Sequence, residues 1–229
     1  MIYIAEIGMN YNGNFGLCYE LIKQAKLSGA NIAKFQLGWR DGPNEINQLD
    51  LQKVKKIIEW CKSFNIEPLF SIISKKGYEI IKKTKITKIK IASRSLKYDF
   101  NLVKKIVNEN KKKEIIISLG MWNKKNLPFK NKNVKYLWCV SKYPAFNEDL
   151  RKFPKKFSKN LFFGYSDHTI GIETCLLAIS RGAKLIEKHF TLDKSDTTIR
   201  DHALSATPEE FRNMVNIGNE ISKKLELGI

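Results

Sequence analysis

Residues 161–190 read LFFGYSDHTIGIETCLLAISRGAKLIEKHF. Two apolar segments, Leu161–Ser166 and Lys184–Phe190, are typical of buried strands, and the intervening Ile170–Arg181 is typical of a helix. This order predicts two parallel strands joined by a helical crossover. The chain has three histidines, and His168 and His189 each follow one of these apolar runs. Because parallel strands end at the same edge of a sheet, the pair predicts a metal site.

The same alternation of strand-like and helix-like segments extends through the rest of the chain. Further strands are expected at Ile2–Gly8, Ile32–Gln36, Pro68–Ile72, Lys88–Ser93, Glu114–Gly120 and Val134–Ser141. Further helices are expected at Phe15–Gly29, Asp50–Phe64, Lys75–Lys83, Phe100–Asn110, Asn147–Phe157 and Pro208–Leu225. No glycine-rich dinucleotide-binding motif follows the first strand, which argues against an open doubly wound sheet. We therefore predict an α/β fold, a compact (β/α)₈ TIM barrel that occupies residues 1–229 as one domain.

The composition favours a cytoplasmic enzyme. No apolar run reaches the roughly 18 residues that a membrane span requires, and no secretory signal precedes the first strand. The four cysteines are scattered, which predicts reduced and buried thiols. The net charge is +18, but the lysines are spread along the chain and no nucleic-acid-binding motif is present. We expect no nucleic-acid partner and no membrane contact, and a positive field that attracts anionic substrates.

Charged side chains interrupt several of the apolar strands. Lys34, Lys90 and Glu187 stand inside such runs, where an unpaired charge costs several kcal/mol. We therefore expect them to face one another or a ligand. Two lysines and several strand-end serines at one barrel mouth predict a phosphate or carboxylate site. Each residue alone has a plainer explanation, since a single serine often bonds its own backbone and a single histidine is often structural.

The chain resembles the sialic acid synthase family, which includes the N-acetylneuraminate, legionaminate and pseudaminate synthases. The segments that carry the resemblance are Ile4–Gly13, Ala33–Gln36, Lys90–Ser93, Cys139–Pro144, Gly164–Thr169, Glu187–Asp193 and Asp201–Pro208. It implies a barrel enzyme that condenses phosphoenolpyruvate with an N-acetylated amino sugar and water, giving a nonulosonic acid and phosphate. It also implies a homodimer and a divalent metal, Mn²⁺ or Mg²⁺.

The resemblance further implies a role for each site residue. His168 and His189 match the metal ligands, and Glu6 matches a carboxylate beside the reacting carbons. The residues that match the phosphoenolpyruvate pocket are Lys34, Lys90, Ser93, Ser118, Ser141 and Ser166. Tyr143 and Asp201 match contacts to the amino sugar. His202 lies in a loop beside Asp201, and we do not expect it to be a ligand.

The sequence also departs from the family pattern. Tyr11 stands where the family usually has a histidine, and Ile72 where it has a threonine at the phosphoenolpyruvate end. Leu119 stands where the family often has a threonine, and Ser95 where it often has an acidic residue. The loop after the second strand is short, so an amide contact to the sugar has only Asn44 and Asn47 as substitutes. The C-terminal antifreeze-like domain of two-domain members is not expected here.

Two other functions therefore stay open. One is a catalytically impaired barrel that acts as a sugar-binding or scaffold subunit. The other is an aldolase with a Schiff base at Lys90.

Overall fold

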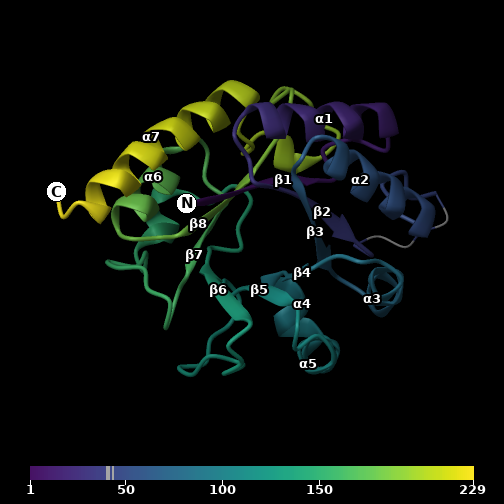
Figure 1. Ribbon diagram of the computed structural model, residues 1–229, viewed down its shortest axis with the longest axis horizontal. Coiled ribbons are helices and arrows are strands. Elements are labelled where there is room, and N and C mark those ends of the chain that lie inside the picture. The colour runs from purple at the N-terminus through teal and green to yellow at the C-terminus, as the bar shows by residue number, and fades with distance from the viewer. Residues whose placement is uncertain (40–41, 43) are drawn as a thin grey trace.

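The computed structural model describes residues 1–39, 42 and 44–229, so part of the loop expected after the second strand lies outside the described residues. The strands are all parallel and close into a barrel in the order β1 to β8 (Figure 1). Their bounds are β1 Ile2–Gly8, β2 Ile32–Leu37, β3 Glu67–Ile72, β4 Lys88–Ile91, β5 Glu114–Ser118, β6 Val134–Trp138, β7 Gly164–Asp167 and β8 Leu185–His189. The predicted (β/α)₈ barrel is confirmed.

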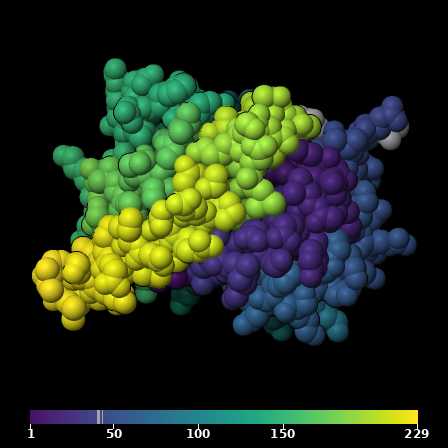
Figure 2. Space-filling model, turned by 90° about the horizontal axis from the view of Figure 1, so that it is seen from above, coloured from purple at the N-terminus to yellow at the C-terminus, as the bar shows by residue number. Residues whose placement is uncertain are grey.

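The helices lie outside the ring of strands (Figure 1). Their bounds are α1 Phe15–Leu27, α2 Leu51–Ser63, α3 Lys75–Lys82, α4 Ser93–Tyr98, α5 Phe100–Glu109, α6 Glu173–Ser180 and α7 Pro208–Glu226, with 3₁₀ turns η1 Asn147–Leu150 and η2 Arg200–His202. The C-terminal helix α7 packs against α6 and α1, so the two ends of the chain share one face of the barrel (Figure 2).

Local capping explains several helix boundaries. The Oγ1 atom of Thr207 accepts a hydrogen bond from the Glu210 backbone N–H at 3.3 Å, and the Glu210 carboxylate accepts one from the Thr207 N–H at 2.9 Å. This capping box, with Pro208 as the first helical residue, starts α7 where the sequence predicts it. At the end of α1, Gly29 follows the cap residue with a φ of +90°, which favours glycine.

Several expected elements differ from those in the structure. The strands expected over Glu114–Gly120 and Val134–Ser141 end earlier, at Ser118 and Trp138. The helix expected over Asn147–Phe157 is only the 3₁₀ turn η1, because Pro154 disfavours helical backbone at the residue before it and clashes with a helix interior. The strand expected over Lys88–Ser93 stops at Ile91, and Ser93 begins the short helix α4. Residues 119–133, between β5 and β6, contain no helix.

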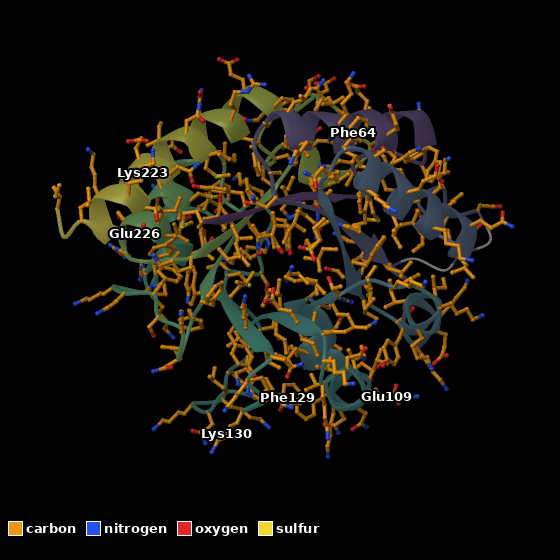
Figure 3. The ribbon with its side chains drawn as sticks, viewed as in Figure 1. Phe64, Glu109, Phe129, Lys130, Lys223 and Glu226 are labelled. Atoms are coloured by element: carbon orange, nitrogen blue, oxygen red, sulfur yellow. The ribbon has the colours of Figure 1, made fainter. Side chains whose placement is uncertain are left out.

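Two apolar clusters hold the barrel together. The larger cluster fills the space between the outer faces of the strands and the helices. The smaller cluster lies inside the barrel and consists of Ile4, Ile32, Leu69, Ile116, Leu137 and Leu185. Side chains fill the interior of the ring (Figure 3), as expected for a barrel of this size. The inner cluster forms the floor beneath the polar residues of the mouth.

The four cysteines are buried and unpaired, as predicted. In the part of the chain that the structure describes, no helix is both long enough and apolar enough to cross a membrane.

Candidate active site

The alternation of side chains along each strand places polar residues directly above the apolar floor. On five strands, the residue two positions beyond a floor residue is polar and also points into the barrel. The floor residues are Ile4, Ile32, Leu69, Ile116 and Leu185, and the polar residues that follow them are Glu6, Lys34, Ser71, Ser118 and Glu187. They line a cavity of about 880 Å³ at the carboxyl ends of the strands. Every site residue expected from the sequence lines this cavity, namely Glu6, Lys34, Lys90, Ser93, Ser118, Ser141, Tyr143, Ser166, His168, His189 and Asp201.

The buried charges inside the strands pair with one another. Lys34 Nζ lies 3.2 Å from Glu6 Oε2 and 3.0 Å from Glu187 Oε1. Lys90 Nζ lies 3.7 Å from Glu187 Oε1 and donates a hydrogen bond to Ser118 Oγ at 2.7 Å. The expectation that these charges face one another is therefore confirmed. Ser166 Oγ also donates to Glu187 Oε1, at 2.7 Å, which places Glu187 at the centre of the cluster.

This cluster separates the pKa values of its members. Burial raises the pKa of Glu6 to about 7, against the opposing effect of Lys34. Burial acts on Glu187 in the same sense, but Lys34 and Lys90 outweigh it and lower the pKa of Glu187 to about 2. Burial lowers the pKa of Lys90, whereas the two carboxylates beside Lys34 raise the pKa of Lys34 in spite of its burial. One carboxyl group of the pair can therefore exchange a proton near neutral pH while the other stays charged.

The two histidines lie side by side, with their ring centroids 5.5 Å apart. The Nδ1 atom of His168 is hydrogen-bonded to the Val140 carbonyl, and Tyr143 packs over the ring at 4.2 Å. Burial lowers the pKa of each histidine to about 3, so both rings are neutral at physiological pH. A neutral imidazole whose Nδ1 proton points to a carbonyl leaves Nε2 available for a metal ion.

These residues fit a divalent metal ion. The Nδ1 atom of His189 is buried, makes no hydrogen bond, and lies 3.6 Å from Asp201 Oδ2. A bound cation would satisfy such an orphaned nitrogen. Among the described residues, no cluster of three or more His, Cys, Asp or Glu side chains forms a complete metal cage. The two histidines would therefore supply part of the ligand set and leave positions for water or substrate.

The hydroxyl groups on the opposite side of the cavity are held by local bonds. Ser93 Oγ lies 3.2 Å from Cys139 Sγ and accepts a hydrogen bond from the Gly120 backbone N–H at 3.1 Å. A Cβ atom at Gly120 would lie only 2.6 Å from both Cys139 Sγ and Ser141 Oγ, so a larger residue there would displace these groups. Ser93, Ser118 and Ser141 thus form a hydroxyl-lined wall beside Lys90, in which Ser93 and Ser118 are held by the contacts given above.

The residues that depart from the family pattern do not line this cavity. Ile72 faces the outer apolar cluster, and its neighbours Ser71 and Ile73 line the cavity instead. At the sequence level, Ile72 in place of threonine is expected to remove one hydrogen bond to the phosphoenolpyruvate end. The structure corrects this expectation, because the Ile72 side chain faces away from the cavity. Tyr11 is buried and donates to the Asn47 carbonyl at 2.8 Å. Asn47 in turn accepts from the Gly13 N–H at 2.9 Å.

The remaining departures are also outside the cavity lining. Neither Asn44, which is exposed, nor Asn47, which is buried, lines the cavity. Neither proposed amide substitute therefore reaches the site. Ser95 Oγ donates to the Ile72 carbonyl at 3.1 Å, and Leu119 packs against the outer core.

His202 has structural partners, in agreement with its exclusion as a ligand. Its Nδ1 atom lies 2.7 Å from Thr191 Oγ1 and its Nε2 atom lies 3.1 Å from Asn12 Oδ1.

Sequence reasoning missed two features of the site region. Asp167 and Lys188, one residue before each metal-ligand candidate, form a fully buried ion pair on the outer face of the strands. Arg94 lines the cavity from α4, a helix too short and too polar to be found from its periodicity. The position of Lys188 inside an apolar run could have indicated a buried ion pair. Nothing in the sequence distinguishes Arg94 from other exposed cations.

The family model described as "NeuB family" matches residues 44–229. The chain belongs to the NeuB family. Among NeuB-family relatives, an uncharacterized protein of Methanocaldococcus jannaschii is 34% identical over 246 residues, which cover 98% of this chain and 72% of that protein. The N,N'-diacetyllegionaminic acid synthase of Campylobacter jejuni is 32% identical over 265 residues, covering 100% of this chain and 78% of that enzyme.

A solved structure supports the same assignment. The N-acetylneuraminic acid synthetase of Leptospira borgpetersenii, crystallised with citrate, superposes with a TM-score of 0.85 at 27% identity. The match covers 98% of this chain and 84% of that one. This NeuB-family chain therefore shares its barrel with enzymes of sialic, legionaminic and pseudaminic acid synthesis.

Proposed function

We propose that this protein condenses phosphoenolpyruvate with an N-acetylated amino sugar and water, giving a nonulosonic acid and phosphate. In this reaction C3 of phosphoenolpyruvate bonds to the sugar aldehyde carbon, water adds to C2, and phosphate leaves. The observation that carries the proposal is the convergence of two lysines, a hydroxyl-lined wall and two neutral histidines on one cavity. The names of the curated relatives support the same chemistry.

We assign the phosphoenolpyruvate end to Lys90 and the hydroxyl-lined wall. A buried ammonium group and hydroxyl donors suit an anion that carries phosphate and carboxylate oxygens. Lys34, fixed between Glu6 and Glu187, would hold the two carboxylates at the reacting carbons. Because Lys90 and Lys34 are already positioned by their partners, they need little reorganisation when the substrate binds.

We assign the acceptor end to the histidines and their neighbours. His168 and His189 would hold Mn²⁺ or Mg²⁺, which as a Lewis acid polarises the sugar aldehyde. Tyr143 packs against both histidine rings, with ring centroids 4.2 and 5.8 Å away, so its side chain lies beside the acceptor end. Asp201, 3.6 Å from His189, would accept hydrogen bonds from sugar hydroxyl or amide groups.

Glu6 is the residue we assign to proton transfer. Its Oε2 atom is buried and, among the described residues, has an ion pair with Lys34 but no hydrogen bond of good geometry. A carboxyl group with a pKa raised to about 7 accepts a proton from an attacking water at neutral pH. Gln36 Nε2 donates to Glu6 Oε1 at 3.1 Å and orients the group.

The test is an acceptor panel. Purified protein is incubated with Mn²⁺, phosphoenolpyruvate and either N-acetylmannosamine, its phosphate ester or a 2,4-diacetamido sugar, and phosphate release is followed. We expect release that requires both the sugar and the metal. If no sugar in the panel increases phosphate release above the sugar-free rate, the proposal is wrong, and a protein that also takes up no Mn²⁺ would favour the non-catalytic sugar-binding or scaffold subunit instead.

We further propose a cytoplasmic homodimer, for which size-exclusion chromatography with light scattering is the test. The unpaired buried cysteines are compatible with a reducing compartment.

A further inference from the structure

Arg94 is held at the mouth of the cavity by two aromatic rings. It follows Ser93 on α4, is exposed, and lines the cavity together with the catalytic candidates. Its guanidinium carbon lies 5.2 Å from the ring centroid of Trp39 and 5.0 Å from that of Tyr98. Trp39 follows β2 and Tyr98 ends α4, so the side chain bridges two parts of the rim. Contact with two rings limits the motion of a long side chain.

Arg94 differs from the other cations of the rim in its partners. Lys142 is paired with Asp149, and Arg200 Nε lies 3.5 Å from Asp201 Oδ1. For Arg94 the described residues supply only the aromatic contacts and no carboxylate. Among the described residues, therefore, no acid neutralises the charge of Arg94.

The chemistry of the guanidinium group indicates the ligand. Stacking on aromatic faces leaves its N–H donors free at the edge of the plane. That planar fork matches two oxygens of a phosphate or carboxylate group. A pre-positioned, unpaired fork that opens onto a substrate cavity is therefore an anion-binding group.

The position of Arg94 assigns this anion to the acceptor sugar. The hydroxyl-lined wall for phosphoenolpyruvate lies on β5, in the loop after β6 and at the start of α4, whereas the Arg94 side chain packs on Trp39 after β2. Its guanidinium is thus directed toward the β2 side of the mouth. The lysines at the floor are already engaged by Glu6, Glu187 and Ser118. Among the described cations that line the cavity, Arg94 is the one whose contacts include no carboxylate, so it is available to a second anion at the mouth.

We propose, resting on the function proposed above, that Arg94 determines specificity for an acceptor amino sugar that carries a phosphate monoester. The phosphate oxygens would accept the N–H donors of Arg94 while the aldehyde end of the sugar lies at His168 and His189. The same fork would serve a carboxylate, or the phosphate of phosphoenolpyruvate itself, and the experiment separates these cases.

The experiment compares N-acetylmannosamine with its 6-phosphate, which differ by this group alone. Wild-type protein, Arg94→Ala and Arg94→Lys are assayed for phosphoenolpyruvate consumption, and KM and kcat are measured for each acceptor and for phosphoenolpyruvate. Lys97→Ala is the matched control, because Lys97 is an exposed cation on the same helix that does not line the cavity. Direct titration of the sugar phosphate, and of the corresponding sugar with a carboxylate at C6, into each protein without phosphoenolpyruvate gives a second readout.

We expect wild-type protein to prefer the phosphorylated sugar. Arg94→Ala should raise KM for that sugar at least about tenfold, with kcat and the KM for phosphoenolpyruvate unchanged. Arg94→Lys should recover only part of the affinity, and Lys97→Ala should behave as wild type. In the titration, the sugar phosphate should bind wild-type protein more tightly than Arg94→Ala.

Four results overturn the inference. Equal use of both sugars by wild-type protein would remove the need for a phosphate. A rise in the KM for phosphoenolpyruvate alone would assign Arg94 to the other substrate. Tighter binding of an acceptor carboxylate than of the phosphate would change the ligand class. Absence of turnover with every sugar contradicts the proposed function, and equal titration affinities in wild type and Arg94→Ala contradict this inference separately.

Discussion

Replacement of Lys188 by methionine tests the buried ion pair that joins β7 to β8 beside the histidines. Lys188 Nζ donates to Asp167 Oδ2 at 2.7 Å, and both side chains are fully buried. The other carboxylate oxygen accepts from Tyr165 Oη at 2.7 Å and from the Thr169 backbone N–H at 2.9 Å. These bonds fix the backbone on both sides of His168. Lys188→Met keeps the volume but leaves the Asp167 charge without its counter-ion.

The expected loss is large because the charge that remains is buried. Removal of one partner from a buried pair costs about 3–5 kcal/mol, a sizeable share of the roughly 5–15 kcal/mol that stabilises a domain. The control is Lys223→Met. Lys223 forms an exposed ion pair with Glu220 on α7, so this variant should lose no more than about 0.5 kcal/mol. Urea unfolding at pH 7 gives the free energy of unfolding of each variant.

The sign of the pH dependence provides a further check. Burial alone would raise the pKa of Asp167, but Lys188 and the hydrogen bonds lower it below its ordinary value. A lowered native pKa stabilises the protein above the unfolded pKa of about 3.9 and loses this contribution as pH falls through the native pKa. Without Lys188 the buried carboxyl group has a raised pKa, so the difference in free energy of unfolding between wild type and Lys188→Met should narrow as the pH falls from that raised pKa to the lowered pKa of the wild type. The double variant with Asp167→Asn should recover about 1–3 kcal/mol of the loss.

A loss in Lys188→Met similar to that in Lys223→Met would refute this reasoning. A difference in free energy of unfolding that grows as the pH falls would also refute it, because the charge of Asp167 would then not be the cause of the destabilisation.

Three other substitutions test the site and the barrel. Glu6→Gln should lower kcat by about 10²–10⁴-fold with little change in either KM, because it removes the proton acceptor but keeps the volume; an unchanged kcat contradicts the role. His189→Ala should weaken Mn²⁺ binding, measured by titration, at least about 100-fold; unchanged binding excludes the residue as a ligand. Gly164→Ala should destabilise the fold by about 1–3 kcal/mol, because the new Cβ atom would lie 2.0 Å from the Leu185 carbonyl oxygen. The control is Gly42→Ala, whose Cβ atom would meet no atom within 4 Å, and this variant should have the free energy of unfolding of wild type.

The barrel could be predicted because its strands are apolar on both faces. Segments such as Ile2–Gly8 and Glu114–Ser118 are buried by helices outside and by the apolar floor inside, so each stands out as a continuous run. The polar residues at the carboxyl ends of such runs then define the mouth without any knowledge of side-chain contacts. This is why every expected site residue lines the same cavity.

Other features depend on information that the sequence does not carry locally. The pairing of Asp167 with Lys188 follows from the register of β7 against β8, which is set by the closure of the barrel. The helix α4 is six residues long and is not preceded by a side-chain cap, so it lacks both periodicity and a start pattern. The role of Arg94 could not be predicted either, because its contact with Trp39 joins two segments that are far apart along the chain.

Mass spectrometry of the reaction products tests the central claim most directly. Protein incubated with Mn²⁺, phosphoenolpyruvate and an accepted amino sugar should yield a nonulosonic acid and an equimolar amount of phosphate. The mass of the acid should equal the masses of the sugar, phosphoenolpyruvate and water minus that of phosphoric acid. Glu6→Gln should form both products far more slowly. Phosphate release without a sugar-containing acid, or release that does not depend on the sugar, would contradict the account.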